Sequence, residues 1–287
     1  LNVIPHVELN QGGYYVKGGM YRISEALFEL SEKMGVTFQF DSKVEKISVR
    51  NKRAVSVKIE GEGEFNADLI VANSDATDTI LNLMDQQAVP NSKRKSQKSI
   101  EPSCSGFVML LGVNKQWDQL KHHNIFFSED YEKEFRQIFK EKTLPDDPTI
   151  YVANTSYTDP DHAPANGSNL FILVNSPYVT DQQHWSSLRE TYSSFLINEL
   201  ESRGLQGLQE AVLVKEVITP LDFLHQYGSN RGSIYGTSSN SKFAAFLRPR
   251  NKIRGISNLY LVGGSTHPGG GIPLVIQSAF NALELID

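Results

Sequence analysis

The residues best suited to chemistry lie near the end of the chain, where five glycines fall within nine residues: Gly263, Gly264, Gly269, Gly270 and Gly271. Glycine has no side chain, so such a loop lets the main chain approach a large flat ligand and adopt dihedral angles that other residues avoid. Ile272 and Pro273 follow directly, and proline suits the first turn of a helix because its missing N–H is not needed there. The pattern predicts a glycine loop that opens a helix.

Apolar segments flank this loop on both sides. Leu259–Val262 is a continuous apolar run, typical of a buried strand. From about Pro273 a helix is expected, with apolar residues at helical spacing at Val275, Ile276, Ala279, Leu283 and Ile286. Its N-terminus would offer free N–H groups and the positive end of the helix dipole, which favour a phosphate or the negative charge of a reduced flavin. On this pattern alone, a purely structural connection stays open.

Other reactive side chains give weaker signals. His267 lies in the glycine loop, where it could tune a bound ring, contact a substrate or simply bond to the main chain. Cys104 sits in an apolar run and is interpreted as a buried small hydrophobe. His122 and His123 have no partner at metal-ligand spacing, and adjacent side chains are expected to point apart toward the surface. We therefore assign no catalytic acid or base and expect no metal site.

The elements around these residues follow from periodicity. A helix is predicted over residues 18–35, an antiparallel meander over 44–59, and a strand buried on both faces over 68–73. Asn73, Ser74 and Asp75 offer caps for a helix that runs to Leu83. Further strands are predicted over 107–113, 150–155, 170–174 and 212–218, and helices over about 129–142 and 183–203. The basic residues Lys93, Arg94, Lys95 and Lys98 are interpreted as a solvated surface.

Several segments together resemble the bacterial carotenoid (phytoene or dehydrosqualene) desaturases. The stretch NLYLVGGSTHPGGGIPLVIQSA, residues 258–279, resembles the C-terminal signature of that family. Weaker matches occur in the same order along the chain, at residues 14–20 (YYVKGGM), 44–47, 67–76, 158–164, 227–236 and 248–249. The resemblance spans nearly the whole chain and is specific only when these matches are taken together.

The resemblance implies a cofactor and a reaction. It implies FAD, with Val44 near the adenine side and with Gly263 and Gly264 close to the cofactor. It also implies that four residues face the flavin ring: Gly271, Ile272, Pro273 and Val275. It implies an oxidoreductase that removes two hydrogens from a long apolar isoprenoid such as phytoene or dehydrosqualene. The family's N-terminal Gly-x-Gly-x-x-Gly motif, which holds the pyrophosphate, has no counterpart in the chain. We therefore expect a C-terminal part of an enzyme that does not retain FAD by itself and is inactive alone.

The implied fold is α/β, with a partial Rossmann-type FAD-binding domain and an α+β substrate domain that has a mixed or antiparallel sheet. Residues 1–82 and 250–287 are assigned to the first domain and residues 83–249 to the second. Leu1 is not a usual initiator residue, which fits a chain derived from a longer protein.

Composition narrows the classes of partner. The chain has 287 residues, 39% of them hydrophobic and 21% charged, and a net charge of -5, so a nucleic-acid partner is not expected. Its apolar runs are too short to cross a bilayer. We expect a cytoplasmic protein with peripheral contact to the inner face of the cell membrane. The segment 242–248 (KFAAFLR) mixes basic and apolar residues and is a candidate for that contact, although a core-facing segment fits it as well.

Two other functions stay open. A flavin amine oxidase or protoporphyrinogen-type oxidase belongs to the same broad superfamily, but its final signature would differ from the Thr266–Gly269 run. A non-catalytic module that binds an apolar isoprenoid would need no redox cofactor. The electron acceptor, the substrate length and the number of steps are not fixed by the sequence, nor is the choice between desaturation and oxygenation.

Overall fold

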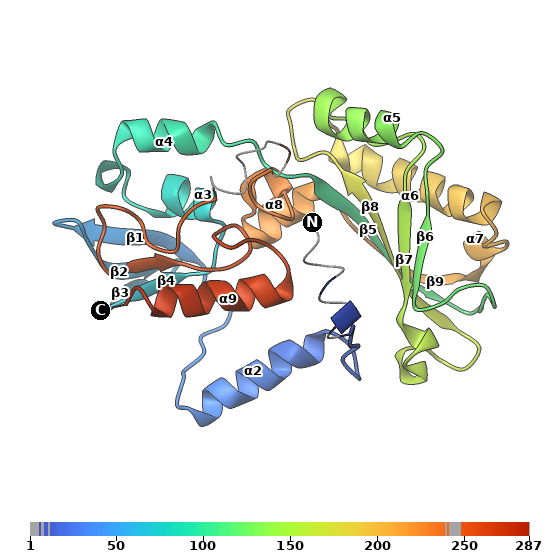
Figure 1. Cartoon of the computed structure of the whole chain (residues 1–287), viewed down its shortest axis with the longest axis horizontal. Coiled ribbons are helices and arrows are strands. Elements are labelled where there is room, and N and C mark those ends of the chain that lie inside the picture. Colours follow the sequence, from blue (N-terminus) through green and yellow to red (C-terminus); the bar gives the residue numbers. More distant parts are fainter. Residues whose placement is uncertain (1–5, 7–8, 11, 239, 241–247, 287) are drawn as a thin grey trace.

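The computed structural model describes residues 6, 9–10, 12–238, 240 and 248–286. Figure 1 shows two groups of elements side by side. One contains the strands β1 to β4, the last helix and the helices α3 and α4, and the other contains a larger sheet with α5, α6 and α7. The predicted α/β organisation is confirmed, and each group has its own hydrophobic core.

The first part of the chain follows the predicted pattern. Helix α2 (Tyr21–Lys33) is confirmed, and strands β1 (Val44–Arg50), β2 (Arg53–Ile59) and β3 (Gly63–Asn66) form an antiparallel sheet. Asn51 and Lys52 make the turn between β1 and β2 with positive φ angles, a geometry that asparagine tolerates well. The meander is therefore built by local turn chemistry.

The parallel pair that leads to the glycine loop consists of β4 (Ile70–Ala72) and β10 (Leu259–Leu261). All of β10 is buried, as expected, but β4 is not buried on both faces, since the Val71 residue is 49% exposed. The prediction for residues 68–73 was wrong on this point because Val71 borders an open cavity instead of a packed layer. Helix α9 (Ile272–Leu283) follows the glycine loop.

Short helices complete this group. Asp75 caps α3 (Ala76–Asp78) by accepting hydrogen bonds from the main-chain N–H groups of Thr77 and Asp78, and a π-helical turn, η1 (Thr79–Leu83), extends it. The 3-10 turn η2 (Gln86–Ala88) and helix α4 (Asn91–Lys98) come next. The core of this group contains Ile47, Ala54, Ile70, Ala76, Ile80, Met84, Val89, Ile253, Ile256, Leu259 and Leu261.

The second group is built on a five-stranded antiparallel sheet. Its spatial order is β6 (His123–Phe126), β7 (Ile150–Asn154), β8 (Ser168–Ser176), β5 (Ser105–Val113) and β9 (Val212–Ile218). The four strands predicted here are confirmed, and β6 was not foreseen. Side chains on one face, among them Phe107, Met109 and Ile172, form the core with helix α6 (Trp185–Ser202).

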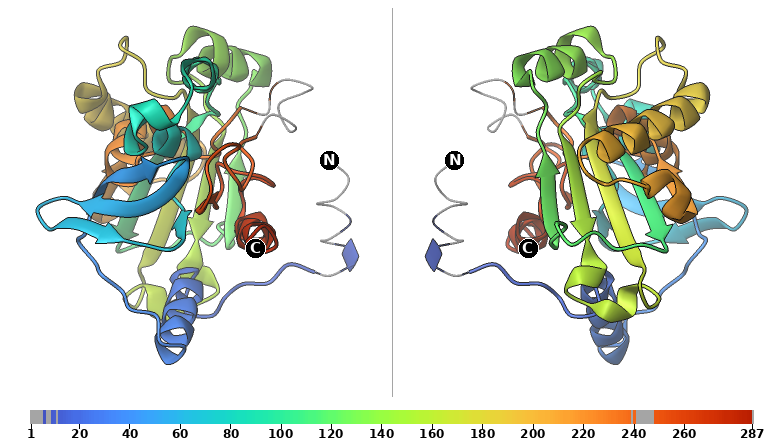
Figure 2. Two further views of the ribbon diagram at one scale, coloured as in Figure 1. Left: turned by 90° about the vertical axis from the view of Figure 1, so that its left-hand side faces the viewer. Right: turned by 90° about the vertical axis from the view of Figure 1, so that its right-hand side faces the viewer.

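The remaining elements connect these strands. They are α5 (Tyr131–Arg136), the π-helical turn η3 (Gln137–Glu141), the 3-10 turns η4 (Thr155–Tyr157) and η5 (Pro160–His162), α7 (Leu208–Ala211), α8 (Pro220–Tyr227) and the 3-10 turn η6 (Asn230–Gly232). The two views of Figure 2 show α5 and α6 on the side of the sheet away from α2 and α9. No helix among the described residues has the length and apolar character required to cross a bilayer.

Asp222 joins α8 to α6. It accepts hydrogen bonds from the Thr219 main-chain N–H at 2.6 Å and from Arg189 Nη2 at 2.8 and 2.7 Å. Burial raises the pKa of the Asp222 carboxyl, but the hydrogen bonds from Thr219 and Arg189 outweigh it and leave the pKa below its usual value. The ionised carboxylate therefore contributes stability at neutral pH.

Asp222→Asn is expected to lower the free energy of unfolding at pH 7 by about 1–2 kcal/mol, through the weakened cap and ion pair. A lowered pKa gives stability that is present above the unfolded-state pKa and is lost as the pH falls through the folded-state pKa. The difference between wild type and variant should thus begin to shrink as the pH drops below about 4 and vanish below the folded-state pKa. Urea unfolding at several pH values measures this, and the exposed Asp118 gives a control variant, Asp118→Asn. A difference that persists in acid would contradict the prediction.

Candidate functional site

The glycine loop starts where the two parallel strands end. The Val262 N–H donates to the Ala72 carbonyl at 3.0 Å, which places Gly263 beside Asn73 at the carboxyl edge of the pair. Gly263 has φ +99°, and a Cβ atom at this position would overlap the Asn73 side-chain oxygen. This position thus needs glycine for two reasons, its backbone angle and the close approach of Asn73.

Asn251 holds the loop from the inside. Asn251 is buried, with 4% of its surface exposed. Its Nδ2 donates to the carbonyls of Leu261 and His267 at 3.0 Å and of Ser278 at 3.3 Å. Ser278 Oγ also accepts a hydrogen bond from the Gly263 N–H at 2.8 Å. Sequence reasoning missed Asn251, because its acceptors lie 10 to 27 residues further along and no local pattern marks it.

Arg248 lies against the outer side of the loop. Its Nη1 donates to the carbonyls of Tyr235 and Gly264 at 3.1 Å, and burial lowers the pKa of the guanidinium. A Cβ atom on Gly269 would lie 3.3 Å from Arg248 Cζ, so the loop packs closely on this cation. The arrangement puts a positive charge near the loop main chain.

The other end of the loop is open. Gly271 has φ +101° with no heavy atom within 4 Å of a Cβ built on it, and residues 271–274 are exposed. Helix α9 begins at Ile272, so Pro273 is its second residue, one place later than expected. The N–H of Val275 bonds to the Gly271 carbonyl at 2.9 Å. The first turn of α9 therefore presents its main chain and the positive end of its dipole to open space.

Val44 lines a cavity of about 500 Å³ that lies beside the start of the glycine loop. Asn73 borders this cavity and also contacts the position of Gly263, so it connects the two places. The other lining residues are Lys43, Ile47, Val57, Ile70, Val71, Ala72, Ser74, Asp78, Leu83, His225, Gln226 and Gly228. The structure thus puts six of the seven predicted residues on the glycine loop and the start of α9, and Val44 across the ends of β4 and β10 from them.

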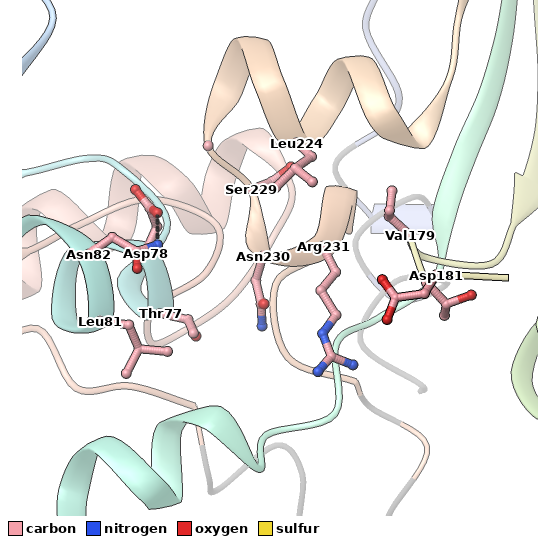
Figure 3. A pocket seen from close by; sticks show the side chains of 12 residues that line it. Thr77, Asp78, Leu81, Asn82, Val179, Asp181, Leu224, Ser229, Asn230 and Arg231 are labelled. Carbon is pink, nitrogen blue, oxygen red and sulfur yellow. Dashed lines mark hydrogen bonds between the residues drawn. The ribbon is translucent and has the colours of Figure 1, made fainter. Parts of the chain in front are cut away.

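A polar cavity of about 480 Å³ continues from this one, since Asp78 and Gly228 line both. Figure 3 shows Asn230 and Arg231 reaching into it from η6, opposite the hydrogen-bonded pair of Asp78 and Asn82. Its walls come from both groups of elements, so the two groups meet at a polar boundary.

An apolar cavity of about 720 Å³ lies along the open face of the five-stranded sheet. Leu110 and Phe171 face each other across β5 and β8, and Val214 extends the surface on β9. No strong hydrogen-bond anchor is needed for a hydrocarbon, so such a surface would select a ligand by shape.

The histidines differ partly from expectation. The His267 main chain is held by Pro249 and Asn251, and its side chain is exposed. The rings of His122 and His123 lie 4.4 Å apart and do not point away from each other, so that prediction was wrong. The reason is that His122 precedes β6 and packs against Tyr15, outside the alternation of a strand. Among the described residues, no group of three or more His, Cys, Asp or Glu could hold a metal ion.

Comparison with proteins of known sequence gives extensive matches. The chain is 39% identical over 286 residues to a 1-hydroxycarotenoid 3,4-desaturase of Flavobacterium sp. (strain P99-3). It is 37% identical over 290 residues to a 4,4'-diaponeurosporene oxygenase of Staphylococcus aureus (strain MSSA476). Each alignment covers 100% of this chain and 57% of the relative. The chain is a homologue of carotenoid desaturases and oxygenases.

No protein-family model matches this desaturase homologue. It spans little more than half the length of the curated relatives it matches. Among solved structures, an oxidoreductase from Methanosarcina mazei has a TM-score of 0.60 at 17% identity, covering 93% of this chain and 55% of that one. Cyclohexylamine oxidase from Brevibacterium oxydans has a TM-score of 0.57 at 13% identity, covering 94% and 53%. At these low sequence identities, the structural similarity shows only that this chain shares their fold.

Proposed function

We propose that the intact enzyme containing this chain is an FAD-dependent desaturase that removes two hydrogens from a long apolar isoprenoid. The observation that carries the proposal is the open glycine loop at the N-terminus of α9, where no side chain fills the space beside Gly271. FAD, when bound, would accept the two electrons that leave the substrate with its two hydrogens, and an external acceptor would reoxidise it. The open glycine loop favours a redox enzyme over a non-catalytic binding module, because a binding module would not need such a loop.

In this proposal each part of the site has a role. The main chain of Gly263 and Gly264 approaches the cofactor at the strand ends, and Val44 contacts its adenine side from the adjoining cavity. Gly271, Ile272, Pro273 and Val275 face the flavin ring. The dipole of α9 and the Arg248 guanidinium both favour the negative charge that the ring acquires on reduction.

We propose that residues 1–82 and 250–287 form part of the FAD-binding domain and that residues 83–249 form the substrate domain. The two separate hydrophobic cores support two domains, with Met84 and Val89 packed in the core of the first. The apolar cavity on the open face of the five-stranded sheet would then hold part of the isoprenoid, with Leu110 and Phe171 in contact with it.

The test uses the full-length enzyme with FAD under anaerobic conditions. The expected result is that a carotenoid precursor bleaches the flavin absorbance, whereas a primary amine does not. Bleaching by the amine instead would favour an amine oxidase, and a full-length protein that holds no flavin would refute the redox proposal. The 287-residue chain is expected to retain no FAD in the same preparation.

Leu110→Trp is expected to lower kcat/KM for the long isoprenoid by about tenfold or more, since misfits of a methylene or more in an apolar site cost about 10- to 200-fold. The indole would fill part of the cavity where Leu110, 36% exposed, now borders open space. Ile125→Trp is the control, because Ile125 is exposed on the same sheet but does not line that cavity. Flavin content should be unchanged in both variants. An equal loss in both would count against the assigned substrate position.

Oxygenation is the second candidate, because one relative is named an oxygenase. It shares the cofactor and the apolar substrate but adds oxygen to the product. Mass spectrometry separates the two, since desaturation removes two hydrogens per step and oxygenation increases the mass.

We further propose that the intact enzyme works in the cytoplasm at the inner face of the membrane, where an apolar isoprenoid dissolves. Most of the candidate contact segment, residues 242–247, falls outside the described residues. Cell fractionation tests this location.

A further inference from the structure

A second cluster of charges lies in a cavity of about 260 Å³ between α4 and the segment that precedes β10. Its lining residues are Ile80, Lys93, Gln97, Pro249, Arg250, Lys252, Ile253, Arg254 and Leu261. All four charged residues in this lining are basic, and they come from two segments far apart in sequence. The fold therefore gathers positive charge here without an acidic residue in the lining.

Three of the cations that line this cavity have no carboxylate partner among the described residues. Lys93, Arg250 and Arg254 form no ion pair within the part of the chain that the structure describes. Burial lowers the pKa of the Lys93 ammonium, and the nearby Arg254 charge lowers it further. Cations held together in this way repel one another, and an anion between them would remove the repulsion.

Gln97 adds a polar group at the same place. Its Oε1 is buried and has no hydrogen-bond partner among the described residues. A buried polar atom without a partner is unusual and asks for an explanation. An amide oxygen only accepts hydrogen bonds, so this atom offers no bond to an anion, and the three cations supply the attraction.

We propose that this cavity binds a phosphate-bearing anion, held by Lys93, Arg250 and Arg254. Arginine offers a planar fork of donors that matches phosphate oxygens, and lysine adds a point charge. The apolar floor made by Ile80 and Leu261 suits the carbon atoms of a phosphate ester. The site is separate from the glycine loop and does not depend on the proposed redox reaction.

Two sources share this chemistry, a free phosphate ester and the headgroup of a phospholipid. Figures 1 and 2 place α4 at the periphery of the molecule, where either could reach it. Lys95 and Lys98 are exposed on the same helix but do not line the cavity. They provide a control that changes the charge of α4 without touching the site.

The first experiment titrates the 287-residue chain with inorganic phosphate by calorimetry at constant ionic strength. Wild type should show saturable binding at one site. Lys93→Gln with Arg254→Gln should weaken it at least tenfold, and Lys95→Gln with Lys98→Gln should leave it within twofold. Circular dichroism checks that both double variants are folded, which is expected because no ion pair is lost. No saturation in wild type, or equal weakening in the two double variants, would overturn the proposal.

The second experiment identifies the source. The same proteins are sedimented with vesicles of phosphatidylcholine, with and without phosphatidylglycerol. If the ligand is a lipid headgroup, binding to the anionic vesicles should fall tenfold only in the cavity variant. If the cavity variant loses phosphate affinity in calorimetry but binds vesicles as well as wild type does, the ligand is a soluble phosphate ester. Either result supports the site, whereas vesicle binding that falls alike in both variants, without saturable phosphate binding, rejects it.

Discussion

Asn251→Asp is expected to destabilise the chain by about 3 kcal/mol or more at neutral pH, because a buried donor is replaced by an unpaired buried charge. Asn251 Nδ2 faces three carbonyl oxygens, those of Leu261, His267 and Ser278. A carboxylate of the same shape would repel all three and leave them without a donor. The glycine loop would lose the bonds that join β10 to α9.

The loss should depend on pH with a definite sign. The introduced carboxyl would have a raised pKa in the folded state, because only its protonated form can donate to a carbonyl. The destabilisation relative to wild type should therefore shrink as the pH falls from 7.5 toward 5. Urea unfolding followed by circular dichroism measures it, since Trp117 and Trp185 both belong to the other hydrophobic core and would report that core by fluorescence.

Asn169→Asp is the matched control. Asn169 is exposed on β8, and the change is expected to stay within about 0.5 kcal/mol at either pH. If Asn251→Asp were as mild as this control, or if its penalty grew in acid, the role assigned to Asn251 would be wrong.

Gly263→Val is expected to cost about 3 kcal/mol or more, since it adds a strained backbone angle to an overlap in a packed region. Gly263 has φ +99°, and its missing Cβ leaves room for the Asn73 side chain. Chemical unfolding of the chain measures the loss. In the full-length enzyme, flavin content should fall as well, because the loop main chain would have to move away from the strand ends.

Gly255→Val separates the two causes. Gly255 has φ +85°, but nothing lies within 4 Å of a Cβ built there, so this variant carries only the backbone cost of about 1–2 kcal/mol. Adding Asn73→Ala to Gly263→Val should recover the remaining difference, because it removes the overlapping oxygen. Equal losses at the two glycines, with no recovery in the double variant, would show that the approach of Asn73 has no energetic weight.

The local elements near the site were predictable from the sequence. The apolar run at Leu259–Val262 and the five glycines after it specify a buried strand and a loop, because hydrophobicity and missing side chains act within a few residues. The cap at Asp75 and the antiparallel meander over residues 44–59 were foreseen for the same reason. The carotenoid desaturase relationship likewise rests on short motifs that the sequence carries by itself.

Other features depend on contacts between distant segments. Val71 looks like a core residue by its neighbours, yet it borders a cavity because of where β4 lies in the fold. Asn251 meets its three acceptors only when β10, the loop and α9 bring their carbonyls to one amide. The rings of His122 and His123 meet because one residue lies outside the strand.

The sequence by itself determined many of the strands and helices, the glycine loop and the class of relatives, since these follow from periodicity and short-range pattern. Only the tertiary structure decided which cavities exist and which charges share them. The cluster of Lys93 with Arg250 and Arg254 is an example, because the two segments are about 160 residues apart and meet only when α4 packs beside the approach to β10. Side-chain contacts at such separations depend on how whole elements pack, and no local pattern records that.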